Sequence, residues 1–68
     1  MPHIVVKMFP GRTLQQKQDL ADALTQAMIA TLQTPAEAIS VAIEDVEKRD
    51  WMDKVGKPEI SGKAATLF

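Results

Sequence analysis

The chain has no cysteine, one histidine and few aromatic residues, with one tryptophan, two phenylalanines and no tyrosine among its 68 residues. The absence of cysteine excludes disulfides and thiol chemistry. A single histidine without cysteine argues against a structural zinc site, which draws its ligands mainly from these two residue types. No metal site is therefore predicted, and the acidic group Glu44, Asp45 and Glu47 is interpreted as a solvated edge.

The chain also lacks an excess of charge of either sign. Its formal net charge is −1, and acidic and basic residues are interspersed, which argues against a nucleic-acid or anionic membrane partner. No apolar run approaches the roughly 18 residues of a membrane span. The N-terminus has neither the basic nor the apolar region of a signal peptide. We therefore expect a soluble, cytoplasmic protein.

The length of the chain predicts one small domain, residues 1–68. A domain of this size obtains only about 3–5 kcal/mol from its own hydrophobic core. Small scaffolds compensate with disulfides, a metal or partner subunits. Because the first two are excluded here, we expect a homo-oligomer.

The order of elements predicts an α+β fold built on one β-α-β unit. Strands are expected over residues 3–9 and 39–46, a helix over 14–33, and an irregular tail over 47–68. A long crossover helix makes the two strands parallel and the connection right-handed. The helix can cover only one face of this sheet, so Val5 and Phe9 on the other face require a partner subunit.

The predicted helix has a start signal, an apolar stripe and a stop signal. Thr13 and Gln16 match a capping box. Pro35 disfavours helical geometry in the residue before it, so the helix should end near Gln33. Lys17 is expected to lie mainly towards solvent. The apolar stripe is formed by Leu20, Leu24, Ala27, Met28, Thr31 and Leu32.

Pro2 follows the initiator methionine directly and begins the first strand. Trimming of Met1 would leave a free secondary amine in an apolar setting. A free α-amine has an ordinary pKa of about 7.7–8.0, and desolvation or a nearby cation such as Arg12 lowers an amine's pKa. Pro2 is thus a candidate general base. The alternative is a proline that merely starts a strand where no ladder donor is needed.

Together these features resemble the 4-oxalocrotonate tautomerase family of the tautomerase superfamily. The resemblance covers essentially the whole chain: Met1-Pro2 and an apolar strand, the turn Pro10-Gly11-Arg12 followed by Gln16-Lys17, the long helix, the break at Pro35, the strand from Ile39, and Trp51. It implies a small β-α-β tautomerase (MIF-like) subunit with parallel strands, completed by oligomerisation as a dimer or a trimer of dimers.

The resemblance also implies a cofactor-independent enol–keto tautomerase acting on a small molecule that carries a carboxylate. Pro2 would be the general base, Arg12 would bind the carboxylate, and Trp51 would line the pocket. A guanidinium suits bidentate carboxylate binding. The alternatives are a solvated turn arginine for Arg12 and a core or interface aromatic for Trp51.

One departure bears on the substrate. Many family members carry an arginine early in the second strand, where Ser40 stands here. The tail resembles the phenylenolpyruvate-tautomerase-like subgroup, which also lacks that arginine. The resemblance therefore implies a 2-hydroxy-dienoate or aryl enolpyruvate with one carboxylate and an apolar end, rather than a doubly charged dicarboxylate.

Three further residues are candidates for substrate binding, each with a structural alternative. His3 lies beside the base, Ser40 is a donor in place of the missing arginine, and Phe9 is a possible pocket wall. Alternatively, His3 is a structural strand residue, Ser40 an exposed strand serine and Phe9 an oligomer contact. At the level of function, the alternatives are another proline-based activity of the superfamily (dehalogenase, hydratase or decarboxylase) or a non-catalytic oligomeric binding module.

Overall fold

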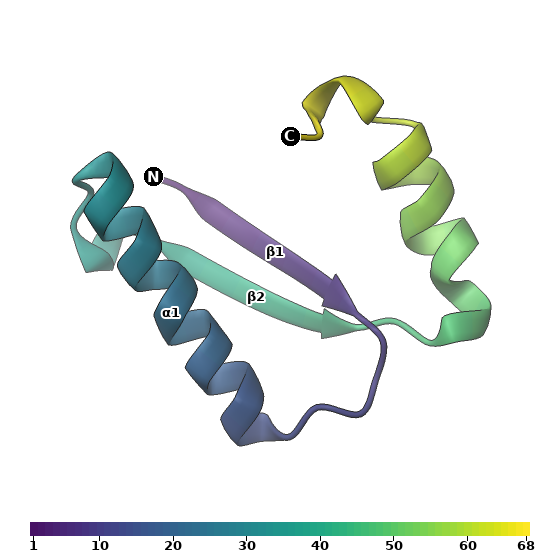
Figure 1. Cartoon of the computed structure of the whole chain (residues 1–68), viewed down its shortest axis with the longest axis horizontal. Helices are drawn as coiled ribbons and strands as arrows, with labels where there is room; N and C mark the ends of the chain where they lie inside the picture. Colours follow the sequence, from purple (N-terminus) through teal and green to yellow (C-terminus); the bar gives the residue numbers. More distant parts are fainter.

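The computed structural model describes all residues, 1–68, and contains one β-α-β unit followed by a helical tail (Figure 1). Strand β1 spans His3–Met8, helix α1 spans Leu14–Leu32, and strand β2 spans Ser40–Asp45. The strands pair in parallel, with His3 opposite Ser40 and Met8 opposite Asp45. The predicted β-α-β architecture with parallel strands is therefore confirmed.

Helix α1 begins and ends at the local signals in the sequence. The Thr13 hydroxyl accepts a hydrogen bond from the Gln16 N–H, and the Gln16 side chain accepts one from the Thr13 N–H, which completes the capping box. At the other end Gln33 adopts a left-handed conformation, with φ of 56°, and its N–H donates to the Ile29 carbonyl. This bond satisfies one of the last carbonyls of the helix.

The buried stripe of α1 is rotated slightly from the predicted one. The half-buried positions are Lys17, Leu20, Ala21, Leu24, Thr25, Met28 and Ile29. The predicted members Ala27 and Thr31 are exposed, and Leu32 is 54 % exposed. The helix covers only the short strand pair, so its last turn extends beyond the apolar surface available to it (Figure 1).

Helix α1 covers one face of the strand pair and leaves the other face uncovered. Ile4 and Val6, with their register partners Val41 and Ile43, are half-buried on the face covered by α1. The opposite face begins with the rung His3–Ser40, continues with Val5–Ala42 and ends with Lys7–Glu44. We call this surface the open face. Val5 on it is 44 % exposed, as expected for a face that one helix cannot cover.

The tail, which the sequence predicted to be irregular, contains helical segments. Segment η1 (Ala36–Ala38) precedes β2, and η2 (Lys48–Asp50), the π-helix η3 (Met52–Ser61) and η4 (Ala64–Thr66) follow it. The tail turns away from the strand pair beyond the end of β2 (Figure 1). The buried apolar residues, Val46 and Val55, join the end of β2 to η3. The small core therefore lies at this junction.

The chain is extended for its size. Its radius of gyration is 13.5 Å, compared with about 11 Å for a compact domain of this length. Its accessible surface is 5265 Å², whereas a folded monomer of 7.5 kDa exposes about 4,250 Å². The isolated chain thus exposes roughly 1,000 Å² more surface than a compact monomer of its mass.

Candidate functional site

The first group of candidate residues lies at the N-terminal end of the strand pair. The Ser40 N–H donates a hydrogen bond to the Pro2 carbonyl, with a nitrogen–oxygen distance of 3.2 Å. This bond fixes Pro2 at the start of β1, where the residue is half-buried. The Pro2 nitrogen has no role in the strand ladder, because proline lacks a backbone N–H. Met1, which precedes it, is fully exposed.

His3 and Ser40 form a side-chain pair directly beside Pro2. They are register partners at the start of the two strands, and 2.6 Å separates His3 Nδ1 from Ser40 Oγ. Both residues are exposed. Which atom donates depends on the histidine tautomer. The sequence placed both residues near the site, but their mutual contact depends on the strand register.

The second group of candidate residues lies at the C-terminal end of the strands. Gly11 adopts a φ of 124°, a value that L side chains rarely take, and so allows the tight turn that presents Arg12. Arg12 is exposed and forms no ion pair within the chain. Its guanidinium is therefore available to an anion. Arg12 borders a pocket of about 170 Å³ lined by Met8, Arg12, Gln16, Lys17 and Leu20.

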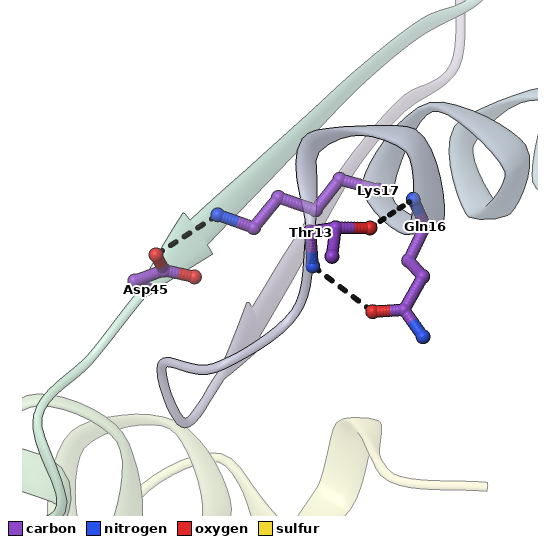
Figure 2. A network of polar contacts seen from close by, with 4 residues as sticks. All are labelled: Thr13, Gln16, Lys17 and Asp45. Atoms are coloured by element: carbon purple, nitrogen blue, oxygen red, sulfur yellow. Dashed lines mark hydrogen bonds and ion pairs between the residues drawn. The ribbon is translucent and has the colours of Figure 1, made fainter.

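A polar network holds the start of α1 against β2. Figure 2 shows Lys17 reaching from the first turn of α1 to the Asp45 carboxylate at the end of β2, with a nitrogen–oxygen distance of 2.9 Å. The capping box of Thr13 and Gln16 lies beside this ion pair. The expectation that Lys17 lies mainly towards solvent is wrong, because this contact leaves the residue half-buried. The network borders the turn that carries Arg12.

The two candidate aromatic residues contact each other. The ring centroids of Phe9 and Trp51 lie 4.8 Å apart at an interplanar angle of 70°, an edge-to-face arrangement. Phe9 follows the end of β1 and remains 46 % exposed, and Trp51 follows η2 and is half-buried. This aromatic pair therefore forms an apolar surface at the same end of the strands as Arg12.

A single chain keeps the two groups apart. The six residues of β1 span about 20 Å, with Pro2 before the strand and Arg12 after it (Figure 1). The structure thus brings Pro2, His3 and Ser40 together at one end, and Phe9, Arg12 and Trp51 towards the other. A small substrate cannot contact both Pro2 and Arg12 of one chain.

An ion pair that the sequence reasoning missed joins the tail to the sheet. Lys7, on the open face, binds Glu59 in η3. The hydrogen bond from Lys7 is the main cause of a lowered Glu59 pKa, and the same bond raises the Lys7 pKa. No local sequence signal indicates this contact, because 52 residues separate the partners.

No group of three or more histidine, cysteine, aspartate or glutamate side chains is placed to hold a metal ion. None of the helices combines the length and the apolar character needed to cross a membrane.

Comparison with known proteins identifies the family. The family model described as "Tautomerase enzyme" matches residues 2–55. A "Probable tautomerase" of Xylella fastidiosa is 48 % identical over 68 residues, covering 100 % of this chain and 83 % of that protein. "Tautomerase PptA" of Cronobacter sakazakii is 44 % identical over 69 residues, covering 98 % of this chain and 90 % of that protein.

Solved structures agree with the sequence comparisons. The crystal structure of TomN, described as a 4-oxalocrotonate tautomerase homologue in the tomaymycin biosynthetic pathway, superposes with a TM-score of 0.71 at 35 % sequence identity. The match covers 96 % of this chain and 97 % of TomN. The shared β-α-β fold, the family match and the identity to named tautomerases lead to one conclusion: the chain belongs to the tautomerase family and is an isomerase with tautomerase activity.

Proposed function

We propose that the protein ketonises a 2-hydroxy-dienoate or an aryl enolpyruvate, with the amine of Pro2 as the general base after removal of Met1. The observation that carries this proposal is the placement of Pro2. Its carbonyl is held by the Ser40 N–H, while its nitrogen is left without a structural role at the start of β1. Met1, the residue to be removed, makes no packing contribution because it is fully exposed.

In this reaction the Pro2 amine moves one proton. The nitrogen lone pair accepts the proton of the substrate's 2-hydroxyl group, and the enol oxygen becomes the carbonyl oxygen. The resulting ammonium then donates a proton to a carbon of the former dienol, which restores the free amine. The step consumes no oxidant and needs no co-reactant. A base of this kind is effective when its pKa lies near the working pH.

Arg12 from a second copy of the chain would bind the substrate carboxylate. Within one chain β1 separates Arg12 from Pro2 by about 20 Å. An antiparallel arrangement of two copies brings the C-terminal end of one strand pair to the N-terminal end of the other. The guanidinium would then bind the carboxylate in bidentate fashion and stabilise charge that develops on the enolate.

The surface of the chain supports this oligomeric arrangement. The chain exposes roughly 1,000 Å² more than a compact monomer, and a standard interface buries about 800 Å² on each partner. Val5 and Phe9 contribute exposed apolar area on or beside the open face. Burying such surface stabilises association by about 25 cal/mol per Å² before the costs of binding. A dimer and a trimer of dimers both satisfy this requirement.

The side chains at the two ends favour a substrate with one carboxylate and an apolar end. Ser40, a neutral residue, stands where many family members carry a second arginine, so this position supplies no second cation for an acid group. The Phe9–Trp51 pair offers an apolar, aromatic surface at the Arg12 end. An aryl enolpyruvate matches this combination. We see no feature that favours dehalogenation, hydration or decarboxylation over tautomerisation.

The proposal is tested by following ketonisation of phenylenolpyruvate by ultraviolet absorbance. Protein shown by intact mass to lack Met1 is compared with its Pro2→Ala variant and with a protein that retains an extension before Pro2. General bases contribute about 10²–10⁴-fold to rate, so the extended protein should lose activity by this factor, and Pro2→Ala, which replaces the secondary amine by the primary amine of alanine, should also lose most of its activity. In the extended protein the prolyl nitrogen is an amide and is not basic. Unchanged turnover in either one would exclude Pro2 as the base.

A further inference from the structure

The chain's single histidine is bonded to the serine at the position of the missing arginine. His3 and Ser40 occupy opposite positions on the first rung of the strand pair, 2.6 Å apart between Nδ1 and Oγ. Pro2 immediately precedes His3, and its carbonyl is bonded to the Ser40 backbone. His3 is therefore the next residue in the chain after the proposed base, and Ser40 is hydrogen-bonded to that base across the strand pair.

The fold does not need this contact. Both side chains are exposed, so neither ring nor hydroxyl would be left buried and unpaired without it. The Ser40 backbone N–H is already satisfied by Pro2. Because hydrogen bonds between solvated groups exchange readily with water, this pair contributes little to stability. Its effect is to orient the hydroxyl group.

The direction of the hydrogen bond decides what Ser40 can offer a ligand. A serine hydroxyl has one proton to donate, whereas its oxygen can accept. If His3 Nδ1 is unprotonated, it takes the hydroxyl proton and leaves Ser40 only as an acceptor. If His3 Nδ1 carries a proton, it donates to Ser40 Oγ and leaves the hydroxyl proton free. An anionic oxygen of a ligand requires the second arrangement.

We propose that the Ser40 hydroxyl donates a hydrogen bond to an anionic oxygen of the substrate beside Pro2, and that His3 is the positioning residue that keeps this hydroxyl proton available. The inference rests on the proposed function, because it assumes that the substrate binds at Pro2. The Pro2 end of the site then has a neutral hydrogen-bond donor, the Ser40 hydroxyl, in place of a second cation. Substrates with one carboxylate and an uncharged end are then preferred over dicarboxylates.

The kinetic test compares variants that keep or remove each half of the pair, using phenylenolpyruvate and Met1-free protein. Loss of a hydrogen bond to a charged oxygen lowers kcat/KM by about 10–100-fold, which is the expected effect of Ser40→Ala. His3→Leu leaves the hydroxyl proton free but no longer orients it, so kcat/KM should fall by more than about threefold but by less than in Ser40→Ala. His3→Asn retains a donor near the Nδ1 position and should stay within about threefold of the parent. Ser40→Thr, which keeps the hydroxyl, should retain activity.

The double variant separates positioning from independent roles. If His3 acts through Ser40, the combination of His3→Leu with Ser40→Ala falls no further than Ser40→Ala alone, because the effects of coupled residues do not add. Additive losses, or an unaffected His3→Leu protein, would overturn the proposal. Ala30→Ser, at an exposed position of α1, is the control for an added hydroxyl away from the open face and should leave kcat/KM unchanged.

A binding measurement distinguishes failure of this inference from failure of the proposed chemistry. His3 is the only histidine, so its ring nitrogens give a single, assignable set of ¹⁵N signals. In the Pro2→Ala variant, saturating cinnamate, a stable aryl monocarboxylate, should place a proton on Nδ1. An unprotonated Nδ1, or no change at any cinnamate concentration, would overturn the inference even if Pro2 is the base. If Nδ1 is protonated but the turnover rate does not depend on Pro2, the result supports the roles of His3 and Ser40 in binding and contradicts the role of Pro2 as the base.

Discussion

The two ends of the strand pair carry different chemistry. The N-terminal end has Pro2 with the hydrogen-bonded His3–Ser40 pair and no lysine or arginine. The C-terminal end has the Arg12 guanidinium beside the Phe9–Trp51 pair. The first end can move a proton, whereas the second can bind an anion with an apolar end.

Under the proposed function, this difference means that one folded chain holds two halves of a site. Strand β1 makes the separation rigid, since its backbone is locked to β2 by the parallel ladder. No side-chain rotation can close a gap of about 20 Å. The halves are therefore useful together only if copies of the chain combine opposite ends. The predictions below test this division, starting with the largest effect.

Mixing two variants that each lack one of the two residues should restore activity, because hybrid oligomers contain sites in which both residues are intact. Pro2→Ala and Arg12→Ala proteins should each retain little activity, because each lacks one half of every site. After mixing, unfolding and refolding together, random pairing of copies gives about a quarter of sites with both residues intact. Ketonisation of phenylenolpyruvate by the refolded mixture measures this recovery.

The control for mixing is the double variant Pro2→Ala/Arg12→Ala refolded with the parent protein. In that mixture, sites formed between unlike chains always lack one residue, so activity comes only from like pairs. Mixed single variants that stay inactive, although mass spectrometry shows hybrid oligomers, would contradict the assignment of the two halves to different copies.

The helix cap should matter specifically at the Arg12 end. Thr13→Ala removes the hydroxyl that accepts from the Gln16 N–H and should cost about 1 kcal/mol of stability. For a chain of this length that lowers Tm by about 4–8 °C. Because Arg12 precedes the cap, KM should rise more than kcat falls. Differential scanning calorimetry and steady-state kinetics at fixed protein concentration measure both effects.

Thr31→Ala is the matched control for the cap. Thr31 is exposed in the last turn of α1, away from the Arg12 turn, and makes no hydrogen bond through its side chain. Its replacement should leave Tm and KM nearly unchanged. An equal loss in the two variants would contradict a specific role of Thr13 as the helix cap.

The smallest expected effect concerns the ion pair between the open face and the tail. The pKa of Glu59 is lowered from 4.5, so its contribution to stability is present above pH 4.5 and is lost as the pH falls through the lowered value. The pKa of Lys7 is raised from 10.5, so its contribution is present below pH 10.5 and is lost as the pH rises through the raised value.

Glu59→Gln should therefore lower Tm slightly between these limits and converge with the parent protein in acid. Both residues are partly exposed, so the effect should shrink with added salt. Glu37→Gln, at an exposed acid without an ion pair, is the control. A Tm difference that persists unchanged at pH 2 would show that Glu59 acts through packing rather than charge.

The sequence predicted the β-α-β unit because its signals are local. The β-branched run after Pro2, the capping box at Thr13 and the break at Pro35 each act over a few residues. The parallel pairing follows from the length of the crossover helix. The tail was not predictable in the same way, because its position depends on contacts such as Lys7–Glu59 between distant residues.

The candidate site also has features that the local sequence predicts and features that depend on tertiary contacts. The residue types and the family resemblance predict Pro2 as a base and Arg12 as a carboxylate ligand, since a strand-borne secondary amine and a guanidinium have distinctive chemistry. The same reasoning missed the ion pair of Lys17 with Asp45, because an exposed helical lysine and a partnered one have the same sequence pattern.

The sequence by itself determined the strands, the helix and the family. Only the tertiary structure decided that His3 bonds Ser40, that Phe9 meets Trp51, and that Pro2 and Arg12 lie at opposite ends of β1. The physical reason is the distance along the chain over which each effect acts. Propensity, capping and side-chain chemistry belong to neighbouring residues, whereas strand register and the distance across a sheet exist only once the chain has folded.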